Sequence, residues 1–160
     1  MVRPDPARTE CFFDGACPGN QFGQKGPMRA AYVIGGQGVV RDVPDLETAQ
    51  GRLRSNNIAE YHGLIFLLRR LREIEAATGQ RGAYVIHGDS QLVIRQMKGR
   101  YRVKADHLRA LHSEAKALAA QLDVIFEEMP RRRNEAGFLL EPKSGNDPRR
   151  TRASEATREN

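Results

Sequence analysis

Residues 82–87 form an almost uninterrupted apolar run, and a long helical pattern leads into it. A strand without polar alternation is typical of a sheet that is covered on both faces, and such sheets are built from parallel strands. Parallel neighbours need a crossover connection, which is right-handed and usually contains a helix. The helix is indicated here by apolar residues at helical spacing, namely Ile58, Tyr61, Leu64, Ile65, Leu68 and Leu71. The chain is therefore expected to belong to the α/β class.

Three shorter strands are expected before this helix, in residues 9–14, 28–34 and 39–43. A glycine-rich turn joins the last two strands, which indicates an antiparallel meander. Residues 44–54 are expected to form a polar connection, and Ser55 or Asn56 caps the helix, which runs to about Ala77. The elements expected after the apolar strand are a short helix to Met97, a basic link at 98–104, a helix at 105–121, a strand at 123–129 and a last helix at 135–141. This order predicts a mixed five-stranded sheet, a three-strand antiparallel meander plus two parallel strands, flanked by helices.

The chain has 160 residues, which is the length of one domain. Prolines and a low apolar content predict a flexible arm at residues 1–8, and the folded domain is expected at residues 9–142. Residues 143–160 hold almost no apolar side chains and are expected to form a disordered polar tail. No apolar run is long enough to span a bilayer, and the first residues lack the apolar stretch of a secretory signal. We therefore expect a cytoplasmic protein, and a monomer.

The net charge is +6 and the sequence pI is about 9.7. This balance favours a polyanionic partner such as nucleic acid, although an arginine-rich solvated surface would give the same numbers. The two cysteines, Cys11 and Cys17, lack the further ligands of a zinc site. We expect Cys11 to be buried in the first strand and Cys17 to be an exposed thiol beside the functional site.

Three acidic residues lie in short polar motifs at or near the ends of predicted elements. Asp14 and Asp89 lie at or near the ends of apolar strands, and Glu60 lies in the first turns of the long helix. Each one alone is more often a turn residue or a favourable partner of the helix dipole. Carboxylates from separate elements that converge in a fold hold divalent cations, and paired cations cleave phosphodiesters. The joint pattern therefore predicts a shared metal site.

The stretches that contain these acids, residues 12–17, 55–65 and 88–105, resemble ribonuclease H type 1. The similarity is greatest to the compact archaeal and bacterial branch that lacks an extra hybrid-binding domain. It implies a ribonuclease H-like topology and cleavage of the RNA strand of RNA–DNA hybrids, leaving a 3′-hydroxyl and a 5′-phosphate. Double-stranded RNA is a second candidate substrate. It also implies Mg²⁺ or Mn²⁺ as cofactor, with Asp14 bridging two ions, Glu60 on the ion near the leaving group and Asp89 on the ion that activates water.

The sequence departs from the family at the fourth carboxylate, which the family places in Asn-x-x-Ala-Asp at the start of the last helix. Here Asn134-Glu135-Ala136-Gly137 is one residue shorter, and Gly137 stands where the aspartate is expected. Three explanations remain open. Glu135 or Glu141 substitutes for it, the site works with three carboxylates and water, or the protein is a catalytically impaired module that binds hybrids or duplexes.

The resemblance also implies substrate contacts that read the shape and the sugar of the hybrid and not its base sequence. Helix capping is the alternative explanation for Asn56 and Asn57, and exposed charge is the alternative for each basic residue. Ser55, with Arg52 or Arg54, is a candidate phosphate pocket. The expected contact residues are Gly15, Ala16, Cys17, Ser55, Asn56, Asn57, Gln91, Lys98, Arg100, Arg102 and Lys104.

Overall fold

The computed structural model describes residues 7–19 and 26–141, and its centre is a mixed five-stranded sheet. The strand order is β3-β2-β1-β6-β7, with β1, β2 and β3 antiparallel and β1, β6 and β7 parallel. This arrangement confirms the predicted fold class. The strands are β1 Thr9–Ala16, β2 Met28–Ile34, β3 Gln37–Val43, β6 Ala83–Gly88 and β7 Asp123–Glu128.

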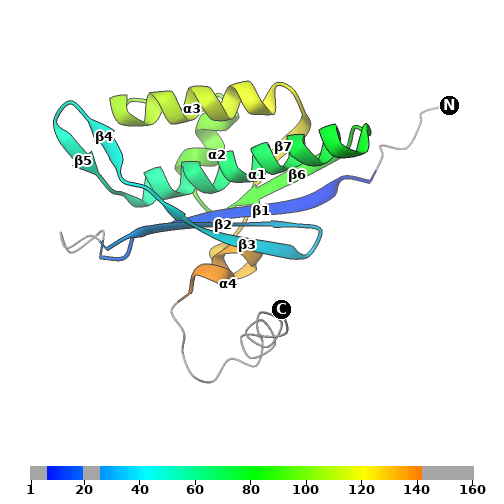
Figure 1. Ribbon diagram of the computed structural model, residues 1–160, viewed down its shortest axis with the longest axis horizontal. Helices are drawn as coiled ribbons and strands as arrows, with labels where there is room; N and C mark the ends of the chain where they lie inside the picture. Colours follow the sequence, from blue (N-terminus) through cyan, green and yellow to red (C-terminus); the bar gives the residue numbers. More distant parts are fainter. Residues whose placement is uncertain (1–6, 20–25, 142–160) are drawn as a thin grey trace, which may run out of the picture.

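Helices cover both faces of the sheet, as Figure 1 shows. The long helix α1 and the helices α2 and α3 lie on one face, and the short α4 lies on the other. A turn of 3-10 helix, Arg131–Arg133, precedes α4. The helices are α1 Asn56–Thr78, α2 Gln91–Met97, α3 Asp106–Ala119 and α4 Glu135–Leu140. No helix of the described residues has the length and apolar character needed to cross a membrane.

The stretch expected as a polar connection contains a two-stranded ribbon that the sequence analysis missed. Its strands are β4 Leu46–Thr48 and β5 Gly51–Leu53. An ion pair between Asp45 and Arg54, 2.5 Å from Oδ1 to Nε, closes the base of the ribbon. Leu46 and Leu53 pack against the core from either strand. The ribbon therefore depends on contacts outside the two strands, which a short polar sequence does not reveal.

The main core lies between the sheet and helices α1 to α3. Its fully buried side chains include Phe13, Tyr61, Leu64, Leu68 and Ile86, so the apolar face predicted for the long helix is confirmed. The helix begins where predicted, because the Ser55 side chain accepts a hydrogen bond from the Ile58 N–H at 3.1 Å. It ends at Gly79, whose φ of 66° is the left-handed conformation that closes many helices.

The two cysteines have similar environments, contrary to the sequence-based expectation. Cys11 is buried, as predicted, but Cys17 is only 4% exposed, so the prediction of an exposed thiol is wrong. The backbone N–H of Cys17 donates to Asn56 Oδ1 at 2.9 Å. This bond ties the end of β1 to the start of α1, and the Cys17 side chain packs into the core.

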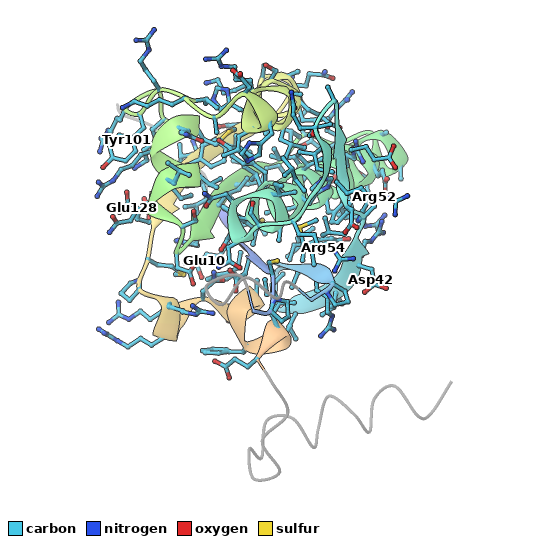
Figure 2. The ribbon with its side chains drawn as sticks, turned by 90° about the vertical axis from the view of Figure 1, so that its left-hand side faces the viewer. Glu10, Asp42, Arg52, Arg54, Tyr101 and Glu128 are labelled. Atoms are coloured by element: carbon cyan, nitrogen blue, oxygen red, sulfur yellow. The ribbon has the colours of Figure 1, made fainter. Side chains whose placement is uncertain are left out.

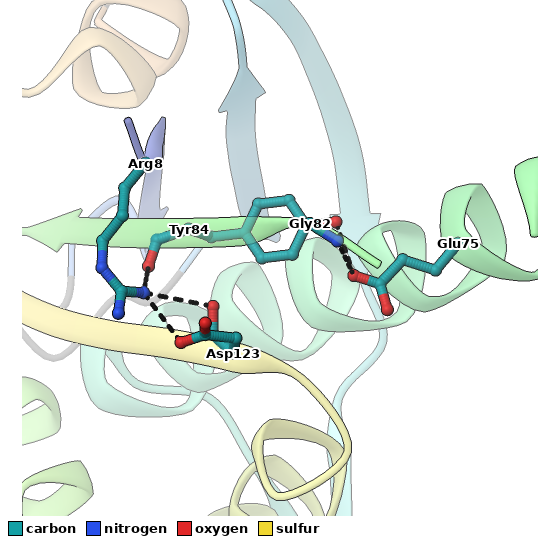
Figure 3. A network of polar contacts seen from close by, with 5 residues as sticks. All are labelled: Arg8, Glu75, Gly82, Tyr84 and Asp123. Carbon is teal, nitrogen blue, oxygen red and sulfur yellow. Dashed lines mark hydrogen bonds and ion pairs between the residues drawn. The ribbon is translucent and has the colours of Figure 1, made fainter. Parts of the chain in front are cut away.

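A polar network joins the starts of three strands to the end of α1 (Figure 3). Arg8 donates to the Tyr84 carbonyl at 3.2 Å and pairs with Asp123 at 2.9 Å. Glu75 Oε2 accepts from the Gly82 N–H at 3.0 Å and from the Tyr84 hydroxyl at 2.7 Å. Arg8 belongs to the arm expected at residues 1–8. Residues 1–6 of that arm and the tail expected at 143–160 lie outside the described residues.

Helix α1 touches strand β1 backbone to backbone at two glycines. A Cβ on Gly15 would lie 2.1 Å from the Ala59 carbonyl carbon, and a Cβ on Gly63 would lie 2.5 Å from the Asp14 carbonyl oxygen. Neither neighbour is a flexible side chain, so any larger residue would push the helix and the strand apart. The contact brings the start of α1 directly onto the strand that carries Asp14.

We predict that Gly63→Ala destabilises the protein by about 1–3 kcal/mol, because the added methyl overpacks a contact between two backbones. Helix propensity alone would favour alanine by about 1 kcal/mol, so the sign of the change is informative. Chemical denaturation followed by circular dichroism measures it. Gly38→Ala is the control, because its Cβ would meet only the mobile end of the Leu139 side chain. A cost no larger than that of the control would contradict the close approach.

Candidate active site

Asp14, Glu60 and Asp89 are brought together by the fold. One carboxylate oxygen from each lies within 4.8 Å of one from each of the others. Strands β1 and β6 run parallel, so Asp14 near the end of β1 and Asp89 just after β6 reach the same edge of the sheet. The third carboxylate, Glu60, arrives from the start of α1 through the glycine contact described above. The convergence expected from the sequence is therefore present.

Burial makes this cluster unfavourable without a counter-charge. Asp14 is 3% exposed and Glu60 8%. Burial, and then the neighbouring Asp14 carboxylate, raise the pKa of Glu60 well above its usual range. Burial and Asp14 also raise the pKa of Asp89, although the positive charge of Arg131 opposes the shift.

Two buried carboxylate oxygens of the cluster lack a hydrogen-bond partner in the described part of the chain, and this observation indicates whether a metal ion fits the site. Among the described residues, neither Glu60 Oε2 nor Asp89 Oδ2 has a hydrogen-bond partner, although both atoms are buried. A buried carboxylate oxygen without a partner is costly unless it is protonated or binds a cation. Hard divalent cations such as Mg²⁺ prefer carboxylate oxygens, so these residues fit such an ion.

Position 137 faces the cluster. A Cβ built on Gly137 would lie 3.2 Å from Asp14 Oδ2, so a side chain at this position would start beside the carboxylates. Glu135 and Glu141, the candidate substitutes for the fourth carboxylate, are both exposed and are not members of the cluster. Gly137 therefore lies beside the cluster but offers it no side-chain ligand.

Asn134 is a residue near the site that the sequence analysis did not single out. It is 0% exposed, and its Nδ2 donates to the Phe13 carbonyl at 2.9 Å, one residue before Asp14. Its Oδ1 accepts from the Ala136 N–H at 3.1 Å and so caps α4. An asparagine directly before a short helix was a visible capping signal, but the bond to β1 was not visible in the sequence.

The residues at the start of α1 have structural roles that only partly match expectation. Ser55 caps the helix. The Asn56 side chain accepts a hydrogen bond from the Cys17 N–H, a role that differs from both roles considered for Asn56 in the sequence analysis, the helix cap and the substrate contact. Gly15 provides the close approach to α1. Asn57 is half-buried and lines a hollow beside α2 and α3.

That hollow has a volume of about 520 Å³, and basic residues of the link at 98–104 form one side of it. A neighbouring hollow of about 610 Å³ lies between the link and the end of β7. Figure 2 shows Tyr101 and Glu128 on this flank of the molecule, and Arg52 and Arg54 on the other. The expected contact residues Gln91, Lys98, Arg100 and Lys104 are all exposed.

Comparison with solved structures identifies the family. The ribonuclease H1 of the halophilic archaeon Halobacterium salinarum superimposes with a TM-score of 0.64 and 30% identity, over 84% of this chain and 94% of that one. The chain belongs to the ribonuclease H1 family. The resemblance inferred from the three acidic motifs is therefore confirmed. No family model matches the chain.

Two further comparisons, both with one mycobacterial protein, agree with membership of the ribonuclease H1 family, and a third shows the same fold. The bifunctional protein Rv2228c of Mycobacterium tuberculosis is 37% identical over 117 residues, which are 72% of this chain but only 30% of that protein. The solved ribonuclease H domain of that protein has a TM-score of 0.59 and 29% identity, over 79% of this chain and 86% of that one. LC11 ribonuclease H1, solved with an RNA/DNA hybrid, shares the fold with a TM-score of 0.65 and 24% identity, over 80% and 89% of the two chains.

We predict that the metal-free protein loses stability as the pH rises above the ordinary range of carboxylic acids. The folded state keeps protons on Glu60 and Asp89 that the unfolded chain has already released, so rising pH favours unfolding. Urea denaturation in a chelator between pH 5 and 8 measures the effect. Glu60→Gln, which cannot ionise, should gain stability over wild type with increasing pH, and a difference independent of pH would contradict the prediction.

Proposed function

We propose that the protein is a metal-dependent endonuclease that hydrolyses the RNA strand of RNA–DNA hybrids and leaves a 3′-hydroxyl and a 5′-phosphate. The observation that carries the proposal is the cluster of three carboxylates within 4.8 Å, with two partnerless oxygens, in a member of the ribonuclease H1 family. The ribonuclease HI of Halobacterium salinarum, 33% identical over 144 residues, or 88% of this chain and 66% of the relative, supports the activity by its name.

Asp14, Glu60 and Asp89 would hold Mg²⁺ or Mn²⁺. Such ions activate a water molecule and stabilise the negative charge that develops in the transition state of phosphodiester hydrolysis. The chain itself provides the rigid frame. Asp14 is fixed in the sheet, Glu60 in α1, and Asp89 in a turn that is closed where the Ser90 hydroxyl accepts from the Val93 N–H at 3.3 Å. This preorganisation removes the need to gather three repelling groups during the reaction.

The hybrid would be bound beside this frame by groups that suit its backbone. The exposed Lys98, Arg100 and Lys104 would reach phosphates of the DNA strand, and Asn57 and Gln91 would face the sugars of the minor groove. An amide both donates and accepts hydrogen bonds, as the RNA 2′-hydroxyl does. Double-stranded RNA, which also carries 2′-hydroxyls, is a second substrate to test.

Gly137 favours a second function, a module that binds hybrids or duplexes without cleaving them. The position faces Asp14 but supplies no ligand, and Glu135 and Glu141 are both exposed and outside the cluster. A site that lacks one carboxylate holds its cations less tightly, and both ions of a paired site take part in the chemistry. Measured turnover decides between the two functions.

We predict that the wild-type protein cuts a labelled RNA–DNA hybrid in the presence of Mg²⁺ or Mn²⁺, and that Asp14→Asn lowers the rate on the order of a hundredfold or more. Gel analysis of the labelled strands gives both the rate and the identity of the strand that is cut. Hybrid binding in a chelator is the control, because it shows that the variant is folded and still recognises its substrate. Equal cutting by both proteins would trace the activity to a contaminant, and cutting of neither strand by wild type would leave only the binding function.

We predict that Gly137→Asp increases the rate on the order of tenfold, or about 1.4 kcal/mol of transition-state stabilisation, because the new carboxylate begins beside Asp14. The same change should lower stability without metal, since a fourth like charge enters the cluster. Gly137→Ala is the matched control that separates the effect of crowding at 3.2 Å from the effect of charge. An unchanged rate would show that another group already completes the site.

A further inference from the structure

The basic segment, residues 98–104, connects α2 to α3 without regular secondary structure. Its side chains Lys98, Arg100, Arg102 and Lys104 are all exposed, and none of them forms an ion pair with another of the described residues. The N–H groups of residues 98–101 donate to carbonyls of α2, whereas the backbone of residues 102–104 has no backbone partner in a helix or sheet among the described residues. Ordering such a segment costs conformational entropy. Its ability to present four positive charges to a nucleic acid therefore depends on what holds its backbone.

Side chains from the flanking helices hold this backbone. Gln96 Nε2 donates to the Arg102 carbonyl at 3.3 Å, and Arg109 Nε donates to the Val103 carbonyl at 3.2 Å. The two donors differ in burial, because Arg109 is exposed and Gln96 is only 3% exposed. A hydrogen bond in the interior is more rigid and more costly to lose than one in water.

Gln96 is itself held from the other side. Its Oε1 accepts a hydrogen bond from the hydroxyl of Tyr61, which is 0% exposed and directly follows Glu60 in α1. His112 Nε2 lies 3.2 Å from the Gln96 carbonyl oxygen, which adds a contact from α3. A continuous chain of hydrogen bonds thus leads from Tyr61 through Gln96 to the backbone of Arg102, and it is buried at its Tyr61 end and partly buried at Arg102.

The outer side of the basic segment has a different support, at the surface. Arg95 pairs with Glu128 at 2.6 Å and hydrogen-bonds the Tyr101 hydroxyl, and its carbonyl accepts from the Arg100 N–H at 2.9 Å. Figure 2 shows Tyr101 and Glu128 on the same flank of the molecule. Ion pairs at the surface contribute little to stability and are weakened by salt. The support through Gln96 contains no ion pair, so salt does not weaken it.

We propose that Gln96 is a positioning residue that presets the basic segment relative to the carboxylate cluster, and so sets the affinity for the phosphates of the nucleic acid without touching them. The inference rests on the proposed function for the identity of the ligand. It assigns to Tyr61 the role of linking the helix that carries Glu60 to the segment that carries the positive charges. Without the hydrogen bonds of Gln96, the basic segment would have to become ordered when the nucleic acid binds, and the entropy lost in that ordering would weaken binding.

The test uses Gln96→Leu, which keeps most of the volume and removes both hydrogen bonds. Binding of a fluorescent RNA–DNA hybrid is measured by anisotropy in a chelator over a range of salt concentrations, so the readout does not depend on turnover. We expect about a tenfold weaker Kd, the size of one buried hydrogen bond, and a smaller slope of log Kd against log salt. The cleavage rate at saturating hybrid should stay unchanged. Gln121→Leu, at an exposed position beyond the far end of α3, is the matched control.

A second background separates positioning from a general structural role. In a protein with Lys98→Met, Arg100→Met, Arg102→Met and Lys104→Met, Gln96→Leu should have little further effect on binding, because the charges that it positions are gone. Equal weakening in both backgrounds would overturn the proposal, and so would unchanged binding by Gln96→Leu in the wild-type background. If Gln96→Leu does not fold, Tyr61→Phe carries the same comparison. A wild-type protein that binds the hybrid without cutting it would refute the proposed endonuclease alone, and one that does not bind it would overturn both proposals.

Discussion

The close packing of α1 on β1 is the constraint on which the site depends. Gly15 directly follows Asp14, and a Cβ on it would lie 2.2 Å from the Glu60 backbone nitrogen. The absence of side chains at Gly15 and Gly63 therefore fixes how near Glu60 comes to Asp14. The contact is made between backbones, so the spacing of the two main chains that carry Asp14 and Glu60 does not depend on the rotamer of any side chain between them.

This packing holds the three carboxylates close together although they repel one another, and the apolar core must offset the cost of that repulsion. Three carboxylates are held close together, and two of them have buried oxygens without a partner. Burial and Asp14 favour the protonated form of Glu60 in the absence of a cation, which is how the folded protein relieves the repulsion. The large apolar cluster under α1 provides the stability that tolerates this arrangement. Local electrostatic conflict inside a well-packed frame is typical of functional sites.

The features that could be predicted from the sequence are those that depend on long periodic patterns and on the order of the elements. The apolar face of α1 and its cap at Ser55 were visible in the sequence, and once the strand order was set, Asp14 and Asp89 had to share one edge of the sheet. The β4–β5 ribbon was missed because its strands are short and its stability comes from the Asp45–Arg54 pair and from packing on the core. A connection of eleven residues in which Leu46 and Leu53 stand seven positions apart carries no periodic signal for such a ribbon.

Single polar residues with distant partners were the least predictable part of the site. Gln96 lies 35 residues from Tyr61 in sequence, and Asn134 lies 121 residues from Phe13, so neither role leaves a local pattern. The buried Cys17 is likewise tied by its backbone N–H to Asn56, 39 residues away. Each of these side chains looks like an ordinary polar or small residue in its own element, and only the tertiary structure shows what it holds.

Asn134 also explains how α4 keeps its place although the fourth carboxylate is missing. Its bonds to the Phe13 carbonyl and the Ala136 N–H dock the start of the helix beside Asp14 through uncharged groups, and Ala136 packs against Phe12 on the far face of the sheet. The docking therefore does not depend on a cation bridging the helix to the cluster. A glycine at 137 leaves one like charge fewer in the cluster, which favours the metal-free fold, but it also leaves one ligand fewer for a cation. On the proposed function, the same residue would lower the repulsion and the affinity for metal together, while the backbone that would present a fourth ligand stays in position.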